Sequence, residues 1–114
     1  MSRYLVQIPR DTLSPERKAG IAKAITEVHS DVTGDAVDTV QVVITEIDAG
    51  CFFSGGSLIE CGHIFVHGFM RDEHQLSTVK DNLSSRLASE TTLAADFEPD
   101  ATWVTLTGAP DLAR

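Results

Sequence analysis

The chain has 114 residues, 42% of them hydrophobic and 23% charged, which is ordinary for one globular domain that buries a core without disulfides. Its net charge of −8 argues against nucleic acid as a partner, because phosphates would be repelled, but allows a small acidic ligand in a pocket with its own local charge. No run approaches the roughly 18 apolar residues that cross a membrane, and the first residues have no signal-peptide pattern. We therefore expect a cytoplasmic protein without membrane contact.

The two cysteines, Cys51 and Cys61, are too few for a disulfide framework, and their spacing matches no zinc motif. We expect both to be free thiols. The sequence predicts neither a bound metal nor any other cofactor.

The first half of the chain predicts a strand, a helix and a second strand. Arg3–Ile8 is typical of a strand and is closed by Pro9. Ser14-Pro15-Glu16 is a strong helix start, with serine as N-cap, proline at the first helical position and an acid in the first turn. The helix then carries one apolar stripe and ends at Gly34, and Thr39–Ile47 favours a second strand. The residues of the stripe are Ile21, Ile25, Val28 and Val32.

The second half repeats the order after a glycine-rich segment. Asp48–Ser57 holds three glycines and two aromatic residues, which indicates an ordered loop with tight turns, but it lacks the Gly-Lys-Ser/Thr of a P-loop. His63–Arg71 is apolar on both alternating faces, so we expect a strand that is covered on both sides. A helix follows after Glu73 and ends somewhere in 88–93, and Thr102–Thr107 forms the fourth strand.

These elements predict an α/β fold of the α+β kind. Two β-α-β halves, about residues 1–57 and 58–114, make a single domain with a four-stranded sheet and both helices on one face. The other face stays uncovered, although two of the strands are apolar on both alternations. Self-association into a closed ring is the simplest way to bury that face.

Several stretches resemble the tautomerase superfamily, and within it the cis-3-chloroacrylic acid dehalogenase family, over most of the chain. The resemblance implies a tautomerase/MIF-like fold of β-α-β repeats and a homotrimer. It also implies a pocket at the start of the first strand, where an N-terminal proline does the chemistry. The similar stretches are Leu13–Pro15, Ala22–Thr26 with His29, Thr33–Gly34, Ala49–Gly50, Phe53–Gly56, Ile64–Gly68 with Arg71, and Trp103–Val104.

By position, His29 and Arg71 match pocket residues of the dehalogenase that position the substrate and bind its carboxylate. Other positions differ, since Ser2 stands where the family has proline, His74 replaces a second arginine and Thr105 replaces a tyrosine. The chain also ends at Arg114 without a counterpart of the acid that would activate water, so efficient dehalogenation is not expected.

We interpret Ser2 and His29 as candidate catalytic residues, with Arg71 and His74 as candidate substrate-binding residues. The primary amine of Ser2 would sit near pKa 7.7–8.0, about right for proton transfer. For each residue a plainer interpretation stays open: an ordinary chain start for Ser2, packing for His29, a salt bridge for Arg71 and a solvated position for His74. The sequence thus favours a weak keto–enol tautomerase of a small 2-oxo acid, or a trimer without catalysis.

Overall fold

A computed structural model describes residues 2–59 and 62–108 of the chain. It contains one four-stranded sheet, built from β1 (Ser2–Pro9), β2 (Val40–Ile47), β5 (Ile64–Met70) and β6 (Thr102–Gly108). The strand order is β2-β1-β5-β6, with β1 parallel to β2, β5 parallel to β6, and β1 antiparallel to β5 at the centre. The two strands of each parallel pair are connected through one helix, α1 (Pro15–Thr33) or α2 (Glu73–Ala95), as in two β-α-β units.

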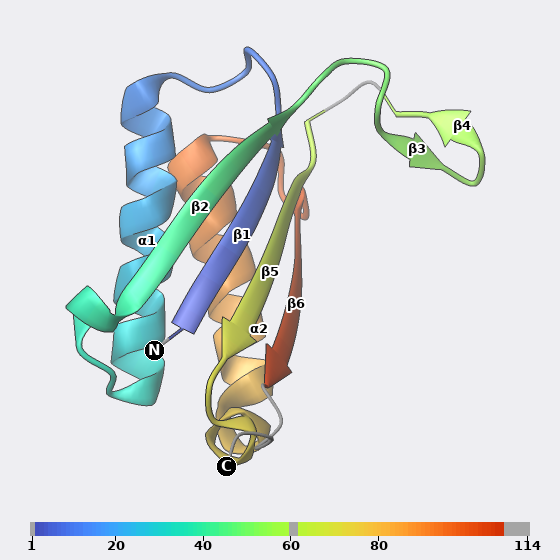
Figure 1. Cartoon of the computed structure of the whole chain (residues 1–114). Coiled ribbons are helices and arrows are strands. Elements are labelled where there is room, and N and C mark those ends of the chain that lie inside the picture. Colours follow the sequence, from blue (N-terminus) through green and yellow to red (C-terminus); the bar gives the residue numbers. More distant parts are fainter. Residues whose placement is uncertain (1, 60–61, 109–114) are drawn as a thin grey trace.

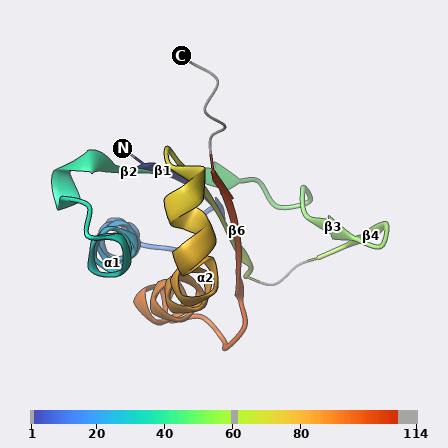
Figure 2. The ribbon, with the colours of Figure 1, turned by 90° about the horizontal axis from the view of Figure 1, so that it is seen from below.

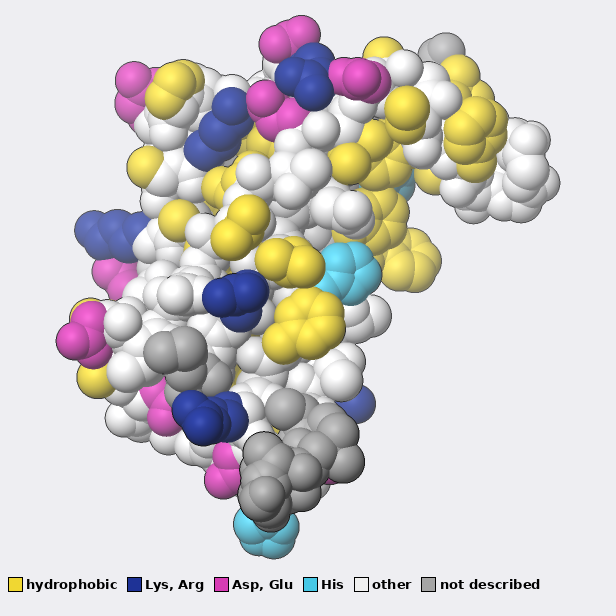
Figure 3. All heavy atoms as spheres, viewed as in Figure 1, with side chains coloured by type: hydrophobic (Ala, Val, Ile, Leu, Met, Phe, Trp, Pro, Cys, Tyr) yellow, Lys and Arg dark blue, Asp and Glu magenta, His cyan; other side chains and the backbone are white. Residues whose placement is uncertain are grey.

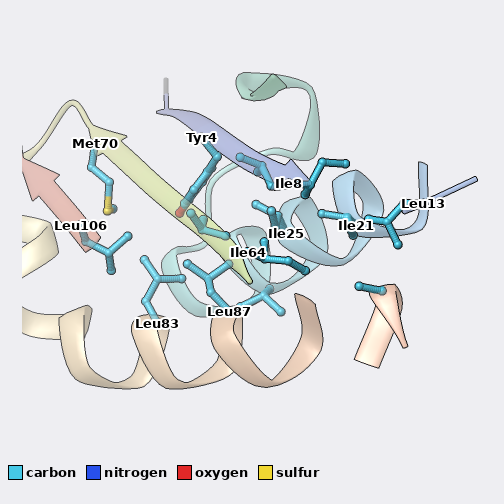
Figure 4. Close-up of a cluster of buried hydrophobic side chains, with 14 of the residues drawn as sticks. Tyr4, Ile8, Leu13, Ile21, Ile25, Ile64, Met70, Leu83, Leu87 and Leu106 are labelled. Carbon is cyan, nitrogen blue, oxygen red and sulfur yellow. The ribbon is translucent and has the colours of Figure 1, made fainter. Parts of the chain in front are cut away.

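Both long helices, α1 (Pro15–Thr33) and α2 (Glu73–Ala95), lie on one face of this sheet, so the predicted α+β architecture is confirmed (Figures 1 and 2). Every second residue of β1 and β5 points toward the helices and is buried. Figure 4 shows Tyr4 of β1 and Ile64 of β5 pointing into the same layer as Ile25 of α1 and Leu83 of α2. Burial of side chains of this size stabilises the fold by about 1.5–3 kcal/mol each.

The ends of the helices follow from local chemistry. The Ser14 side chain accepts a hydrogen bond of 3.1 Å from the Arg17 backbone N–H, and Gly34 ends α1 in the left-handed conformation, both as predicted. The Asp72 side chain caps α2 in the same way, accepting from the Gln75 N–H at 3.0 Å. The second helix continues beyond its predicted end, to Ala95.

The glycine-rich segment after β2 forms a small hairpin, with β3 (Phe53–Ser54) and β4 (Ser57–Leu58) joined at Gly55 and Gly56. Both glycines have positive φ, which a two-residue type I′ turn requires. The hairpin projects away from the body of the protein (Figure 1). Cys51 in this segment is a free, exposed thiol, whereas Cys61 lies outside the described residues.

The uncovered face of the sheet is arranged in rows across the strands. The central row holds Val43, Leu5, His67 and Thr105, and the row toward the start of β1 holds Gln41, Arg3, Phe69 and Thr107. The face is less uniformly apolar on β2 than the sequence indicated, because Gln41 and Thr45 alternate with Val43 there. Its exposed apolar groups come from all four strands, and Figure 3 shows them as a yellow patch beside one histidine.

In the part of the chain that the structure describes, neither helix is apolar enough over its length to cross a bilayer. A short 3-10 turn, η1 (Val37–Thr39), leads from α1 into β2.

Candidate functional site

A pocket of about 450 Å³ opens on the uncovered face where β1 begins and β5 ends. We call it the N-terminal pocket. Strand pairing explains its position, because Ser2 lies opposite both Val40 and Met70, and Arg71 follows Met70 directly. The start of β1 and the end of β5 are thus neighbours, about 4.8 Å apart in the sheet. The pocket is lined by Ser2, Arg3, Leu5, Gln41, Phe69, Met70 and Arg71.

Among the described residues, the lining contains two arginines, Arg3 and Arg71, and no acid. Elsewhere on the described chain most cationic side chains have a carboxylate partner: Arg10, Arg17, Lys18, Lys23 and Arg86 each form an ion pair. Of the described lysines and arginines, only Arg3, Arg71 and Lys80 lack one. Two of these three share the N-terminal pocket, although acids outnumber bases by 17 to 9 in the whole chain.

Arg71 is exposed and makes no described ion pair with its neighbours Asp72 and Glu73. Asp72 is instead occupied as the N-cap of α2. The salt-bridge interpretation of Arg71 within the chain therefore has no support among the described residues. A guanidinium in this state can bind a carboxylate through two parallel hydrogen bonds.

Ser2 is only 3% exposed, with its side chain on the helix side of the sheet and its backbone at the rim of the N-terminal pocket. The pocket thus brings together two of the four candidate residues, Ser2 and Arg71. His74 is not among its lining residues. It is exposed in the first turn of α2.

His29 lies on the other side of the sheet from the pocket opening. It is fully buried in α1, and both ring nitrogens are engaged: the Tyr4 hydroxyl is 2.6 Å from Nδ1, and Asp35 Oδ2 is 2.8 Å from Nε2. An ionised carboxylate only accepts hydrogen bonds, so Nε2 carries the proton donated to Asp35. In the neutral imidazole, Nδ1 then accepts a hydrogen bond from the Tyr4 hydroxyl. The imidazole and phenol rings also meet edge to face, 5.5 Å apart.

Burial raises the pKa of the Tyr4 hydroxyl, and the negative charge of Asp35 raises it further. The phenol therefore stays neutral and remains a hydrogen-bond donor. Space for its ring is made by Gly68 on the adjacent strand, where a Cβ atom would lie 2.6 Å from Tyr4 Cε1. Tyr4 shares its strand face with Ser2, so the Tyr4–His29–Asp35 network lies directly behind the start of β1.

Thr105 of β6 lies on the uncovered face of the sheet. Its hydroxyl is 2.7 Å from Nδ1 of His67 on the neighbouring strand. Neither residue lines the N-terminal pocket. Within residues 2–59 and 62–108, no three histidine, cysteine or acidic side chains gather as a metal site would require.

Sequence reasoning missed Arg3, Gln41 and Tyr4. A usable signal for Arg3 existed, because alternation along β1 places Arg3 with Leu5 on the face opposite Tyr4 and Val6. Gln41 depended on knowing that β2 pairs with β1 in parallel and in this register. The contact of Tyr4 with His29 joins residues 25 positions apart and needs the packed fold.

The family model described as "Tautomerase enzyme" matches residues 5–61, half of the chain. The chain belongs to the tautomerase family. This match begins within β1, covers α1 and β2, and ends close to the start of β5, so it corresponds to most of one β-α-β half and the hairpin that follows. No curated protein matches the sequence.

Solved structures extend the similarity to almost the whole tautomerase chain. N1, a member of the cis-3-chloroacrylic acid dehalogenase family, is 25% identical with a TM-score of 0.86, over 95% of this chain and 75% of its own. The F6 fused 4-OT asymmetric trimer is 20% identical with a TM-score of 0.81, over 96% and 87%. The macrophage migration inhibitory factor-like protein of Entamoeba histolytica is 19% identical with a TM-score of 0.74, over 95% and 88%. The last two show the shared fold alone.

Proposed function

We propose that this tautomerase-family protein is a homotrimer that catalyses slow keto–enol tautomerisation of a small 2-oxo acid. The observation that carries the proposal is Arg71, a guanidinium without an acidic partner among the described residues, in the pocket where β1 begins. That arrangement suits a ligand carboxylate, and family membership supplies the reaction class.

In the proposed reaction Arg71 holds the substrate carboxylate, and the α-amino group of Ser2 moves the proton. Toward the enol, the amine removes a proton from C3, the C–H electron pair forms the C2=C3 bond, and the C=O π pair moves onto the oxo oxygen. The ammonium formed at Ser2 then gives its proton to that oxygen, which restores the free amine. Ketonisation runs the same steps in reverse. An ordinary α-amino pKa of about 7.7–8.0 leaves part of the amine free near neutral pH.

The amine is available only if Met1 is removed. A retained methionine would move the terminal amine by roughly 3.5 Å, which is enough to spoil alignment with C3. We assign His29 a supporting role, because its ring nitrogens are both engaged and it packs behind Ser2 through Tyr4. His74 stays a candidate only for attracting the anion from outside the pocket.

The trimer is supported by the uncovered face of the sheet. Its four largest exposed apolar side chains are Leu5, Val43, Phe69 and Trp103, which lie on four different strands. An exposed apolar patch across a whole sheet marks an interaction surface. Similar structures include four fused 4-OT trimers.

The alternative is a trimer that binds carboxylates without turning them over. Ser2 in place of the family's proline favours it, since a primary amine differs from the secondary amine on which the resemblance relies.

The deciding experiment measures ketonisation of phenylenolpyruvate by ultraviolet absorbance, on protein whose N-terminus is established by mass spectrometry. We expect a rate above buffer for protein lacking Met1, and an Arg71→Ala variant whose kcat/KM is lower by about ten- to a hundredfold. Arg71→Lys should recover only part of this, because an ammonium cannot make the two-pronged contact.

A trimer that binds carboxylates without turning them over predicts different kinetic results. Wild-type protein without Met1 would then show no rate above buffer, and a Ser2→Pro variant would gain one. If Arg71 only held the fold together, Arg71→Ala would lower the melting temperature and leave kcat/KM unchanged in the trimer that remains.

We also expect little chloride release from cis-3-chloroacrylate. Adding water to this substrate needs a general base, which is worth about 10²–10⁴ in rate. Thr105 is a poor substitute for a tyrosine there, and its hydroxyl is already bonded to His67. Chloride measured with an ion-selective electrode should stay close to that of the Arg71→Ala variant, and a rate many times higher would show that another group supplies the base.

A further inference from the structure

His67 lies at the centre of the uncovered face of the sheet. Its strand, β5, is one of the two inner strands, and its neighbours in the row across the sheet are Leu5 on β1 and Thr105 on β6. Nδ1 of His67 is 2.7 Å from the Thr105 hydroxyl, and the side chain is half-buried in the single chain. The proposed reaction leaves this histidine unused, because it does not line the N-terminal pocket.

The surroundings of His67 are mainly apolar. Phe65 and Phe69 lie on either side of it along the same face of β5, and Leu5 lies beside it on β1. The large exposed apolar side chains of this face come from all four strands, so a second copy that covers them also takes water away from His67. A charged group that loses water is destabilised unless it gains an opposite charge.

The uncovered face offers no such opposite charge among the described residues. The ionisable groups that share it with His67 are both cations, Arg3 on β1 and Arg71 directly after β5. Glu46, the acid of β2, lies on the helix side of the sheet, where it pairs with Lys18 at 3.0 Å. The other side chains that β1 and β6 present around His67 are uncharged: Leu5, Gln7, Trp103, Thr105 and Thr107.

The protonation state of His67 therefore affects how readily this face can be buried. A neutral ring meets the Thr105 hydroxyl through Nδ1 and carries no charge into an interface. Histidine is the side chain that ordinarily gains a proton as the pH falls from 8 to 5. Once protonated, His67 would enter an interface as a further cation beside Arg3, with no acid on its own sheet face to pair with.

We propose that His67 is a pH-sensitive switch of the assembly, which lets the subunits associate while its ring is neutral and separates them when acidification charges it. The inference rests on the proposed trimer and adds its regulation. Subunits that separate return His67 to water, where the ring takes up a proton more readily than in a covered face. Free subunits thus bind more protons than the trimer, so the stability of the trimer is complete above the histidine range and is lost as the pH falls through it.

The switch also reaches the N-terminal pocket. Leu5 and Phe69 line that pocket and border His67 on the uncovered face. Separation of the subunits therefore exposes this wall of the pocket together with the interface.

The test is sedimentation velocity of the full chain over a series of concentrations at pH 7.5 and pH 5.5, at constant ionic strength. One proton taken up by each of three subunits raises the concentration at which half of the trimer has dissociated by up to about thirtyfold per pH unit. For the wild type we expect this concentration to rise by at least about tenfold between the two pH values.

Two variants fix the charge at this position. His67→Gln stays neutral and keeps a group that can bond to Thr105, so its dissociation should change less than about threefold between the two pH values. His67→Lys is charged at both, so it should dissociate already at pH 7.5, with far-ultraviolet circular dichroism showing that it is folded. His74→Gln is the matched control, because His74 is an exposed histidine on α2, and it should keep the wild-type response to pH.

The outcomes separate this inference from the trimer on which it rests. A wild-type trimer with the same dissociation at both pH values, or a His67→Gln variant that responds to acid as the wild type does, overturns the switch and leaves the trimer standing. A trimer that tightens at pH 5.5 also overturns it, since His67 would then face an acid of a partner subunit. A wild-type chain that is already monomeric at pH 7.5 overturns both.

Discussion

His29 is hydrogen-bonded to Tyr4 and Asp35 in the core and does not line the N-terminal pocket. A histidine at the border of an apolar helix stripe could face a ligand or the core, and here both ring nitrogens are already bonded within the fold. The network joins β1 to the end of α1 and to the segment that follows Gly34. Tyr4, two residues after Ser2 on the same face of β1, is thereby anchored to α1.

The buried phenol predicts a pH dependence of stability at alkaline pH. The pKa of Tyr4 is raised in the folded protein, so the unfolded chain loses the phenolic proton at a lower pH than the native one. Above an unfolded pKa of about 10, the native state therefore binds more protons, and stability falls by up to about 1.4 kcal/mol for each further pH unit. Below that pH the group contributes no slope.

This expectation can be measured cleanly because the chain has one tyrosine. Absorbance at the tyrosinate band should stay flat at pH 11 in native protein and appear near pH 10 in urea. Unfolding midpoints in urea at pH 9, 10 and 11 should fall more steeply for wild type than for Tyr4→Phe. Native protein that forms tyrosinate near pH 10 while still folded would contradict the buried donor.

At the scale of the elements, short local sequence signals were enough to predict most of the helices and strands. Ser14 with Pro15 placed the start of α1, and Gly34 its end, because capping depends on a few adjacent backbone groups. The end of α2 was missed since no glycine marks it. Asp96 takes the left-handed conformation there with φ 58°, which aspartate tolerates better than most residues, and buried Thr91 and Ala95 hold the last turn against the sheet.

The candidate site was predictable only in part, because some of its residues become neighbours only through strand pairing. Arg71 follows a strand and precedes a helix, so its sequence neighbours identify it. Arg3 and Gln41 become neighbours only when β1 and β2 pair in parallel, 38 residues apart in the chain. Hydrophobic periodicity fixes which face a residue occupies, but register decides which residues of two strands meet.

At the scale of the whole molecule, the two faces of the sheet differ in what covers them. One is covered by α1 and α2, and the other is bare in the single chain (Figure 2). The bare face carries a central polar pair, His67 with Thr105, which satisfy one another by a hydrogen bond. Burial of this pair in an assembly is therefore cheaper than burial of two unpaired groups.

Trp103 gives the most direct test of the assembly, because it lies on the bare face and is 63% exposed. We expect Trp103→Asp to separate the proposed trimer into folded monomers, since burying a carboxylate without a partner costs far more than burying an indole gains. Analytical ultracentrifugation at micromolar concentration gives the mass, and far-ultraviolet circular dichroism shows whether the variant is folded.

Leu93→Asp is the matched control, because Leu93 is even more exposed, at 72%, but lies on α2 rather than on the sheet. If exposed apolar area alone drove association, Leu93→Asp would dissociate the protein as readily as Trp103→Asp. We expect it to keep the wild-type mass. A wild-type chain that sediments as a monomer, or a folded Trp103→Asp variant of unchanged trimer mass, would show that the bare face is not the interface, and the N-terminal pocket would then have to function within a single subunit.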